Sequence, residues 1–257
     1  MNQYIVYMKK YVVLCLLCCC SVFVSMAQSS WELRLMPEIA FGGKNVLQCP
    51  NTVDGTRVPL DQDFDRRRVG VFSPRVELEY VYKRNHFILT AAWLTDKFEG
   101  ISVEDIRFNG TTFDTGSSLL TTYRFDTYRI GYRYRIVARE RFDFELGATL
   151  LVRDASITMN DYNRPVKFTN VGVAPLISYR IGWNPSNRIT VLSYGDGFAV
   201  KQGRAIDVYA GIKYQFNNLL SANLGYRLLD GGSDVESIYT MALYQYLSFG
   251  IGLRIGK

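Results

Sequence analysis

The chain has 257 residues, with 30 basic and 24 acidic side chains, one histidine, five cysteines and a formal net charge of +6. This charge is small and the arginines are spread singly, so we expect no nucleic-acid partner. Beyond the N-terminal segment no stretch stays apolar for about 18 residues, which excludes a protein that crosses a membrane with helices. The length fits a single β-domain.

The N-terminus has the pattern of a secretory signal peptide. Lys9 and Lys10 precede an apolar run over residues 11–24, and a small-x-small cleavage site follows. We therefore predict a signal peptide over residues 1–27 and one mature domain over residues 28–257. Two alternatives stay open. A membrane anchor is one, although the run is shorter than the roughly 20 residues of a spanning helix; a lipoprotein is the other, because the run contains cysteines.

Cleavage changes the cysteine content of the chain. Cys49 would be the only cysteine left, and the formal charge would fall to about +4 because two lysines leave with the signal. One cysteine cannot form an internal disulfide, so we expect Cys49 to be a free thiol even after export.

Residues 128–136 alternate strictly between apolar or aromatic residues and residues that are Arg or Gly. Successive side chains of a strand point to opposite faces, so this segment has one apolar face and one cationic face. The pattern lasts about the 9–11 residues that a tilted strand needs to cross a bilayer. A transmembrane strand is the prediction for this segment.

Similar alternation recurs along the whole chain. The expected strands are residues 31–41, 71–82, 86–95, 128–136, 142–157, 171–181, 188–194, 205–216, 219–229 and 239–255. The expected connections alternate between long segments (42–68, 95–122, 160–170, 195–204 and 230–234) and short turns (83–85, 138–141, 183–187 and 217–218). This alternation is typical of an all-β, antiparallel up-and-down transmembrane β-barrel with both termini periplasmic. We predict about ten strands, with eight as the alternative count.

A soluble β-sandwich also has alternating strands. The predicted strands are long for that fold, and their polar face carries Arg, Asp, Glu and Gly but few lysines. A narrow barrel interior needs buried charges that pair with opposite charges, which favours the barrel.

The polar faces of the predicted strands carry charged side chains that would point into the lumen of the barrel. We expect a structural network, in which the planar guanidinium of Arg holds carboxylates in fixed geometry. Its predicted members are Glu32, Arg34, Arg75, Glu77, Glu79, Arg129, Arg133, Arg135, Asp143, Glu145, Arg153, Arg180, Asp207 and Arg227. Barrels of about eight strands are filled by side chains, so ten strands favour a narrow, charge-filled lumen.

Residues suited to catalysis or metal binding are few. His86 is the only histidine and follows a short turn, so we expect it at the periplasmic rim as a polar girdle residue. Neither a second histidine nor a cysteine pair is present in the mature chain, so no transition-metal site is expected. Residues 61–65 resemble the start of a calcium loop, but Arg66 and Phe72 stand where Gly and Glu are required. The prediction is no catalytic, cofactor or metal site.

Several stretches resemble an uncharacterised family of bacterial outer-membrane β-barrel proteins. They are FDTYR (125–129), YRYR (132–135), LGAT (146–149), VRDA (152–155), QGRAID (202–207) and GYRLLDGGSD (225–234). The resemblance extends from about Tyr123 to the C-terminus. It implies an exported barrel and brings no known activity.

Together these patterns predict a non-enzymatic outer-membrane protein with an envelope-structural role, or a surface-interaction role through the long loops. A small passive pore with weak anion preference is the alternative, and a lipid-modifying enzyme is a further one. The expected partners are outer-membrane lipid, lipopolysaccharide and, during biogenesis, the barrel-assembly machinery. We expect a monomer without cofactors.

Overall fold

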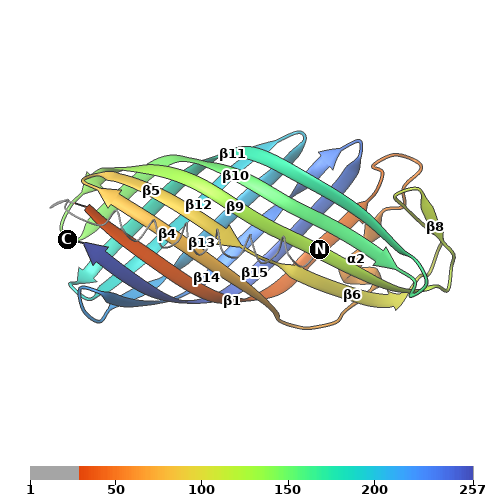
Figure 1. The fold of residues 1–257 in the computed structure, drawn as a ribbon, viewed down its shortest axis with the longest axis horizontal. Coiled ribbons are helices and arrows are strands. Elements are labelled where there is room, and N and C mark those ends of the chain that lie inside the picture. Colours follow the sequence, from red (N-terminus) through yellow and green to blue (C-terminus); the bar gives the residue numbers. More distant parts are fainter. Residues whose placement is uncertain (1–28, 257) are drawn as a thin grey trace, which may run out of the picture.

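The computed structural model describes residues 29–256, and the predicted signal peptide lies outside them. The described chain forms a closed antiparallel barrel (Figure 1). None of its helices is long and apolar enough to span a membrane. The elements are β1 (Ser29–Gln48), β2 (Val58–Pro59), α2 (Leu60–Asp63), β3 (Asp65–Arg66), β4 (Val71–Tyr82), β5 (Asn85–Ala92), β6 (Thr95–Ile101), β7 (Ile106–Phe108), β8 (Thr111–Phe113), β9 (Ser118–Ala138), β10 (Phe142–Asn160), β11 (Pro165–Ser186), β12 (Ile189–Val200), β13 (Gly203–Gln215), β14 (Leu220–Val235) and β15 (Ile238–Gly256).

The wall has ten strands, as the sequence predicts. Each of β9 to β14 pairs with the next strand, β15 pairs with β1, β1 pairs with β4, and β4 pairs with β5. β5 and β6 form one interrupted strand, because both pair with β9 on either side of Trp93 and Leu94. The pairing of β9 with β10 closes the barrel, so the strands form a complete ring in the half near the short turns.

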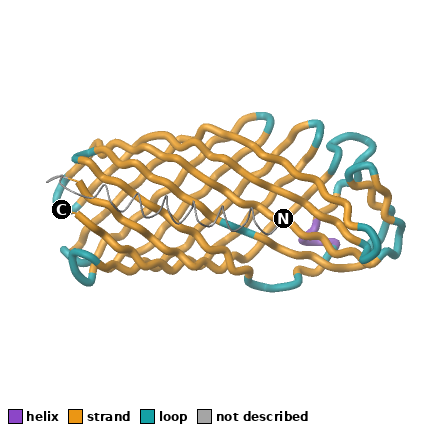
Figure 2. Tube along the Cα trace, in the orientation of Figure 1, coloured by secondary structure: helices purple, strands orange, loops and turns teal. Residues whose placement is uncertain are grey.

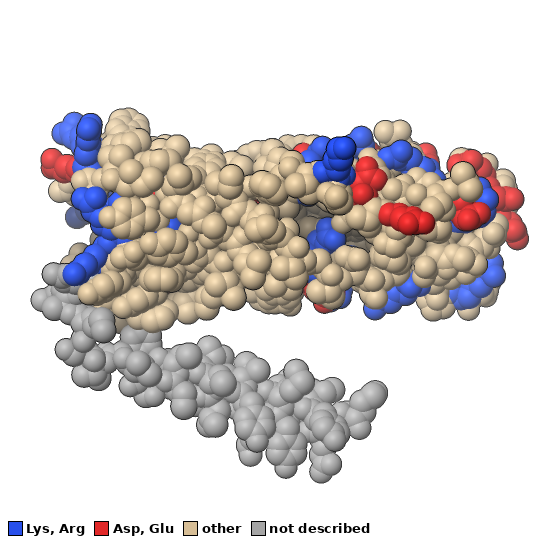
Figure 3. Space-filling model, turned by 90° about the horizontal axis from the view of Figure 1, so that it is seen from above, with Lys and Arg blue, Asp and Glu red and all other residues tan. Residues whose placement is uncertain are grey.

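Alternation places apolar side chains outside and charged side chains inside. On β9, Ile130 is 64% exposed, whereas the neighbouring Arg129 and Arg133 are buried. On β15, Phe249 and Ile251 are exposed on the same outer surface. On the face that Figure 3 shows, the middle of the barrel exterior is accordingly almost free of charged residues. An apolar outer band around a polar interior is the pattern of a barrel surrounded by lipid.

One end of the barrel carries short turns and both ends of the described chain. Ser30 of β1 pairs with Gly256 of β15 at this end (Figure 1). Rings in neighbouring strands contact one another on the outside: Trp31 lies 4.6 Å from Tyr80, and Phe87 lies 5.3 Å from Tyr132, between ring centroids. Aromatic rows of this kind are typical of a membrane–water interface.

The opposite end differs from the sequence prediction. The predicted loops 42–68, 95–122, 160–170 and 195–204 are wrong in part, and the predicted loop 230–234 is wrong, because β1, β6, β11, β12 and β14 extend into these segments and add paired backbone (Figure 2). Loops are thereby largely confined to the two ends of the molecule. The alternation that marks a membrane strand weakens in these extensions, which explains why the sequence suggested loops.

An apolar plug closes this long-loop end. Segments 49–70 and 102–117 fold across the opening and carry α2 and the β7–β8 hairpin. Leu60, Phe108 and Phe113 are almost fully buried there. The whole cluster comprises Ala40, Leu47, Cys49, Val58, Leu60, Phe64, Val71, Leu94, Phe98, Ile106, Phe108, Phe113, Leu119, Tyr123, Ile157, Met159, Ile238, Ala242, Tyr244 and Tyr246.

Candidate functional site: the charged lumen

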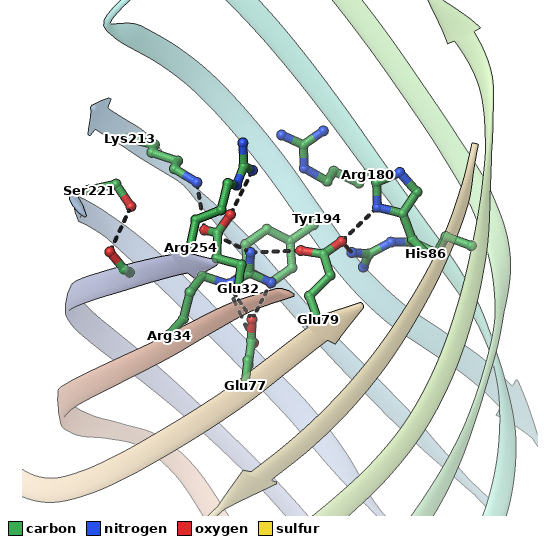
Figure 4. A network of polar contacts seen from close by, with 12 residues as sticks. Glu32, Arg34, Glu77, Glu79, His86, Arg180, Tyr194, Lys213, Ser221 and Arg254 are labelled. Atoms are coloured by element: carbon green, nitrogen blue, oxygen red, sulfur yellow. Dashed lines mark hydrogen bonds and ion pairs between the residues drawn. The ribbon is translucent and has the colours of Figure 1, made fainter. Parts of the chain in front are cut away.

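The lumen below the plug contains two layers of ion pairs, which we name the lower layer, near the short turns, and the middle layer. In the lower layer Glu32 of β1 accepts contacts from three cations (Figure 4). Its carboxylate oxygens lie 2.6 Å from Lys213 Nζ and 2.7 Å from Arg254 Nη2. Arg34 is the third cation, at 3.4 Å. The side chains come from β1, β13 and β15, so the cluster links strands that are far apart in the sequence.

Arg34 also holds two carboxylates of the neighbouring strand. Its guanidinium lies 3.0 Å from Glu77 and 2.9 Å from Glu79, both on β4. Residues 77 and 79 face the same side of β4, so one planar guanidinium reaches both. Both glutamates are buried.

His86 completes this layer and corrects the sequence prediction of a rim residue. Its side chain is buried in the lumen, with Nδ1 2.8 Å from Glu79 and Nε2 3.3 Å from Glu145. Glu145 of β10 is fully buried and also contacts Arg133 at 3.1 Å. The prediction failed because a short turn fixes the end of the barrel but not the face on which a side chain lies.

The rest of the lower layer gathers around Glu145. Arg135 lies 3.5 Å and Arg180 3.4 Å from its carboxylate. Arg180 also donates to Asp143. Asp143 and Glu145 therefore act as the acidic partners that the arginines of β9 and β11 need.

The middle layer is centred on Arg227, one of the largest fully buried side chains described. Its guanidinium lies 2.9 Å from Glu38 and 2.7 Å from Asp207. Arg75 and Arg129 also contact Asp207, at 2.8 and 2.6 Å. Three arginines and two carboxylates thus cross the lumen at one level and leave beside them a cavity of only about 20 Å³.

The structure places every predicted network residue on the inner face. All except Arg153 form ion pairs within the two layers. Arg153 lies nearer the plug, where it donates to Asn170 and Ser233. Sequence reasoning missed Asp196, which contacts Arg129 at 3.4 Å, because residues 195–204 were expected to be a loop. The alternation Leu192, Tyr194, Asp196 would have revealed it.

Glu79, His86 and Glu145 also form a possible cation site, since one ligand atom from each lies within 4.8 Å of the others. Guanidinium groups already occupy both carboxylates: Arg34 contacts Glu79, and Arg133 contacts Glu145. A metal ion would have to displace these cations and then sit beside them. The arrangement therefore favours an ion-pair network over a metal centre.

A cavity of about 220 Å³ lies within the lower layer, and a wider one of about 820 Å³ lies below it at the short-turn mouth. Basic residues outnumber acidic ones around the mouth. They are Arg135, Arg139, Arg180, Arg188, Lys213 and Arg254, against Glu140 and Asp143.

Neither a protein-family model nor a curated protein matches the chain. Among solved structures, the outer-membrane protease OmpT from Escherichia coli is similar with a TM-score of 0.53 and 6% identity, over 88% of this chain and 96% of that one. Neisserial surface protein A has a TM-score of 0.34 and 13% identity, over 88% and 96%. Ail of Yersinia pestis has a TM-score of 0.38 and 9% identity, over 89% and 99%. The likeness to OmpT concerns the fold alone: this chain has the fold of a ten-stranded outer-membrane β-barrel.

Proposed function

We propose that the protein is a non-enzymatic β-barrel of the bacterial outer membrane, with a closed lumen and a role in envelope structure or surface contact. The apolar outer band supports membrane residence. Short turns and both described chain ends share one end, which supports a periplasmic position for that end. The plugged end would then face the exterior.

The observation that carries this proposal is double closure of the lumen. The middle layer blocks the barrel with buried ion pairs such as Arg227–Glu38, and the apolar plug blocks it again above. Each barrier uses a different kind of interaction, so opening one leaves the other in place. A continuous water path along the barrel axis would require both to rearrange.

Planar-bilayer recording tests closure directly. Folded protein, verified by its heat-dependent mobility in gels, should insert without a stable conductance. A variant that lacks residues 103–116 tests the two barriers separately, and it should stay closed because the ion-pair layers remain. An open conductance of the wild-type protein that scales with salt would instead establish the passive pore.

The cationic mouth is the one feature that favours the pore as second candidate. Arg139, Arg188 and Arg254 line it, with Glu140 among the few acidic groups. If current is observed, the reversal potential in a salt gradient should indicate anion preference. Charge reversal by Arg188→Glu should weaken that preference.

We further propose that lipopolysaccharide binds to the outer surface of the barrel. An outer hollow of about 300 Å³ near the long-loop end is lined by Arg67, Arg68 and Lys97 beside the exposed Phe72. Cations next to an apolar surface suit a phosphorylated lipid. Lipopolysaccharide that co-purifies with wild type should be reduced in a variant with Arg67, Arg68 and Lys97 replaced by Gln. Mass spectrometry of the same lipid after incubation tests for enzymatic modification, for which we expect no mass change.

A further inference from the structure

The barrel wall opens between β11 and β12 toward the long-loop end. Their pairing ends at Ile177 and Gly197. Above this point β11 continues to pair with β10 as far back as Pro165, and β12 continues to pair with β13 as far as Val200. The two hairpins therefore separate, and in the described chain no ladder joins them across the gap. The face shown in Figure 3 is hollowed at this level, beside Lys and Arg side chains.

Side chains that should be sealed inside the wall are exposed at the gap. Phe198 and Val200 lie on the same face of β12 as Asp196, which points into the lumen. Phe198 is nevertheless 45% exposed and Val200 54% exposed. They border a pocket of about 200 Å³ whose floor includes the buried Leu151 and Leu176. The pocket is thus an apolar crevice that opens sideways.

The crevice lies where the outer surface changes from apolar to charged. On β11, Val171, Val173 and Ile177 are exposed on the outside. Asp154 of β10, which pairs with Val171 in register, forms an external ion pair with Arg124. In a membrane this level would correspond to the upper boundary of the hydrocarbon layer. A lipid chain could enter the crevice from the side.

Arg153 lies at the same level but faces inward, and it lines the crevice. Its Nη2 donates to Asn170 of β11 at 3.0 Å and to Ser233 of β14 at 2.9 Å, so the side chain reaches across the interior. Both partners are neutral. In the described part of the chain no carboxylate lies within ion-pair distance of it, whereas the neighbouring lumen arginines are paired. Its buried Nε has no hydrogen-bond partner.

A cation in apolar surroundings is costly unless an anion compensates it. The layers below show how this chain normally supplies that anion, with a carboxylate from a neighbouring strand. At Arg153 the facing strand instead has Gly172, and a Cβ placed there would lie only 3.0 Å from the guanidinium. Gly172 therefore leaves room for Arg153 without neutralising it.

We propose that the crevice between β11 and β12 binds a long-chain fatty acid. Its carboxylate would pair with Arg153, and its acyl chain would lie along Leu151, Leu176 and Phe198 and leave through the gap toward the bilayer. The inference does not depend on whether the lumen conducts. It rests on charge complementarity between a carboxylate and the guanidinium of Arg153, which has no ion-pair partner in the described chain. The adjacent apolar surface can contact an acyl chain.

Binding of hexadecanoic acid to the purified full-length protein in nanodiscs tests the proposal. With a ¹³C-labelled carboxyl group, bound ligand should give a carboxylate resonance distinct from that of lipid-dissolved acid. Hexadecanol, which has the chain without the charge, should compete at least about tenfold less well, because it lacks a charge-assisted hydrogen bond. Equal competition by the alcohol, or no distinct resonance, would overturn the proposal.

Two pairs of variants separate the head-group contact from the chain contact. Arg153→Met should weaken binding about tenfold or more, whereas Arg164→Met, at an exposed arginine of the same hairpin, should leave it unchanged. Ala174→Trp should fill the crevice and abolish binding, whereas Val171→Trp, on the outer face of the same strand and outside the crevice lining, should not. Heat-dependent gel mobility verifies that each variant folds. Unchanged binding by folded Arg153→Met or Ala174→Trp contradicts the assignment.

Discussion

The lumen is filled in two ways, by charges in the short-turn half and by apolar packing in the long-loop half. In the charged half each side chain is held by partners on other strands of the wall, as Glu32 of β1 is by Lys213 of β13 and Arg254 of β15. In the plug, side chains from the segments between strands pack together, as Phe108 and Phe113 do. The first half depends on the register of the wall, and the second on loops that fold as a small core of their own.

This difference predicts two different responses to mutation. Loss of a charge in the ion-pair layers should destabilise the barrel as a whole, because the layers tie several strands together. Loss of packing in the plug should loosen that end while the barrel stays folded.

The largest effect is expected from Arg227→Met. The change leaves Glu38 and Asp207 buried with less compensation, which typically costs about 3–5 kcal/mol when one partner of a buried pair is removed. Urea-induced unfolding in lipid vesicles measures the loss. Arg164→Met, at an exposed ion pair, is the matched control and should change stability by less than about 1 kcal/mol. A small loss for Arg227→Met would show that the middle layer is not a stabilising unit.

Phe113→Ala should cost about 3 kcal/mol, but locally, because it opens a cavity in the plug. Hydrogen exchange should increase in segments 49–70 and 102–117 and remain slow in β13 and β14. Phe249→Ala, on the outer face of β15, is the control and should leave the exchange of the plug unaltered. Faster exchange throughout the barrel would contradict the independence of the two halves.

Gly110→Ala tests the hairpin that carries Phe113. Asn109 and Gly110 both have positive φ (47° and 78°), as the sequence signal Asn-Gly predicts for a tight turn. No atom blocks a Cβ at position 110, so backbone strain of about 1–2 kcal/mol is the expected cost. Hydrogen exchange of β7 and β8 measures it. Gly197→Ala, where φ is ordinary and a Cβ meets only normal contacts, should show no such effect.

The smallest expected effect concerns the reactivity of the Cys49 thiol. Burial within the plug raises the pKa of this thiol to about 11. At pH 8 only about one thiol in a thousand is then ionised, and modification should accelerate about tenfold per pH unit up to pH 10. Phe113→Ala should speed the reaction at fixed pH by exposing the thiol. Fast modification of the wild-type protein at pH 8 would contradict a closed plug.

The sequence allowed the barrel, its ten strands and the inner face to be predicted, because each depends on a period of two within one strand. The expectation that Glu145 meets arginines of the preceding strand follows from such local patterns and a short turn, whereas the register shift that aligns Glu145 with Arg135 does not. The plug could not be predicted, since Leu60 and Phe113 meet only through tertiary packing. His86 was misplaced because its short turn fixes only the end of the barrel, and the partners that hold it inside, Glu79 and Glu145, come from two other strands. The resemblance to an uncharacterised family of bacterial outer-membrane β-barrel proteins stays a prediction.

Several strands are far longer than a bilayer requires. β9, β10 and β11 have 21, 19 and 22 residues, about twice the 9–11 that a tilted strand needs to cross. Residues 161–164 alone join β10 to β11. The part outside the membrane is therefore a rigid paired wall, and an antibody against it should recognise folded epitopes assembled from several strands. Antibodies raised against linear peptides from β10 or β11 should bind the denatured protein but not intact cells.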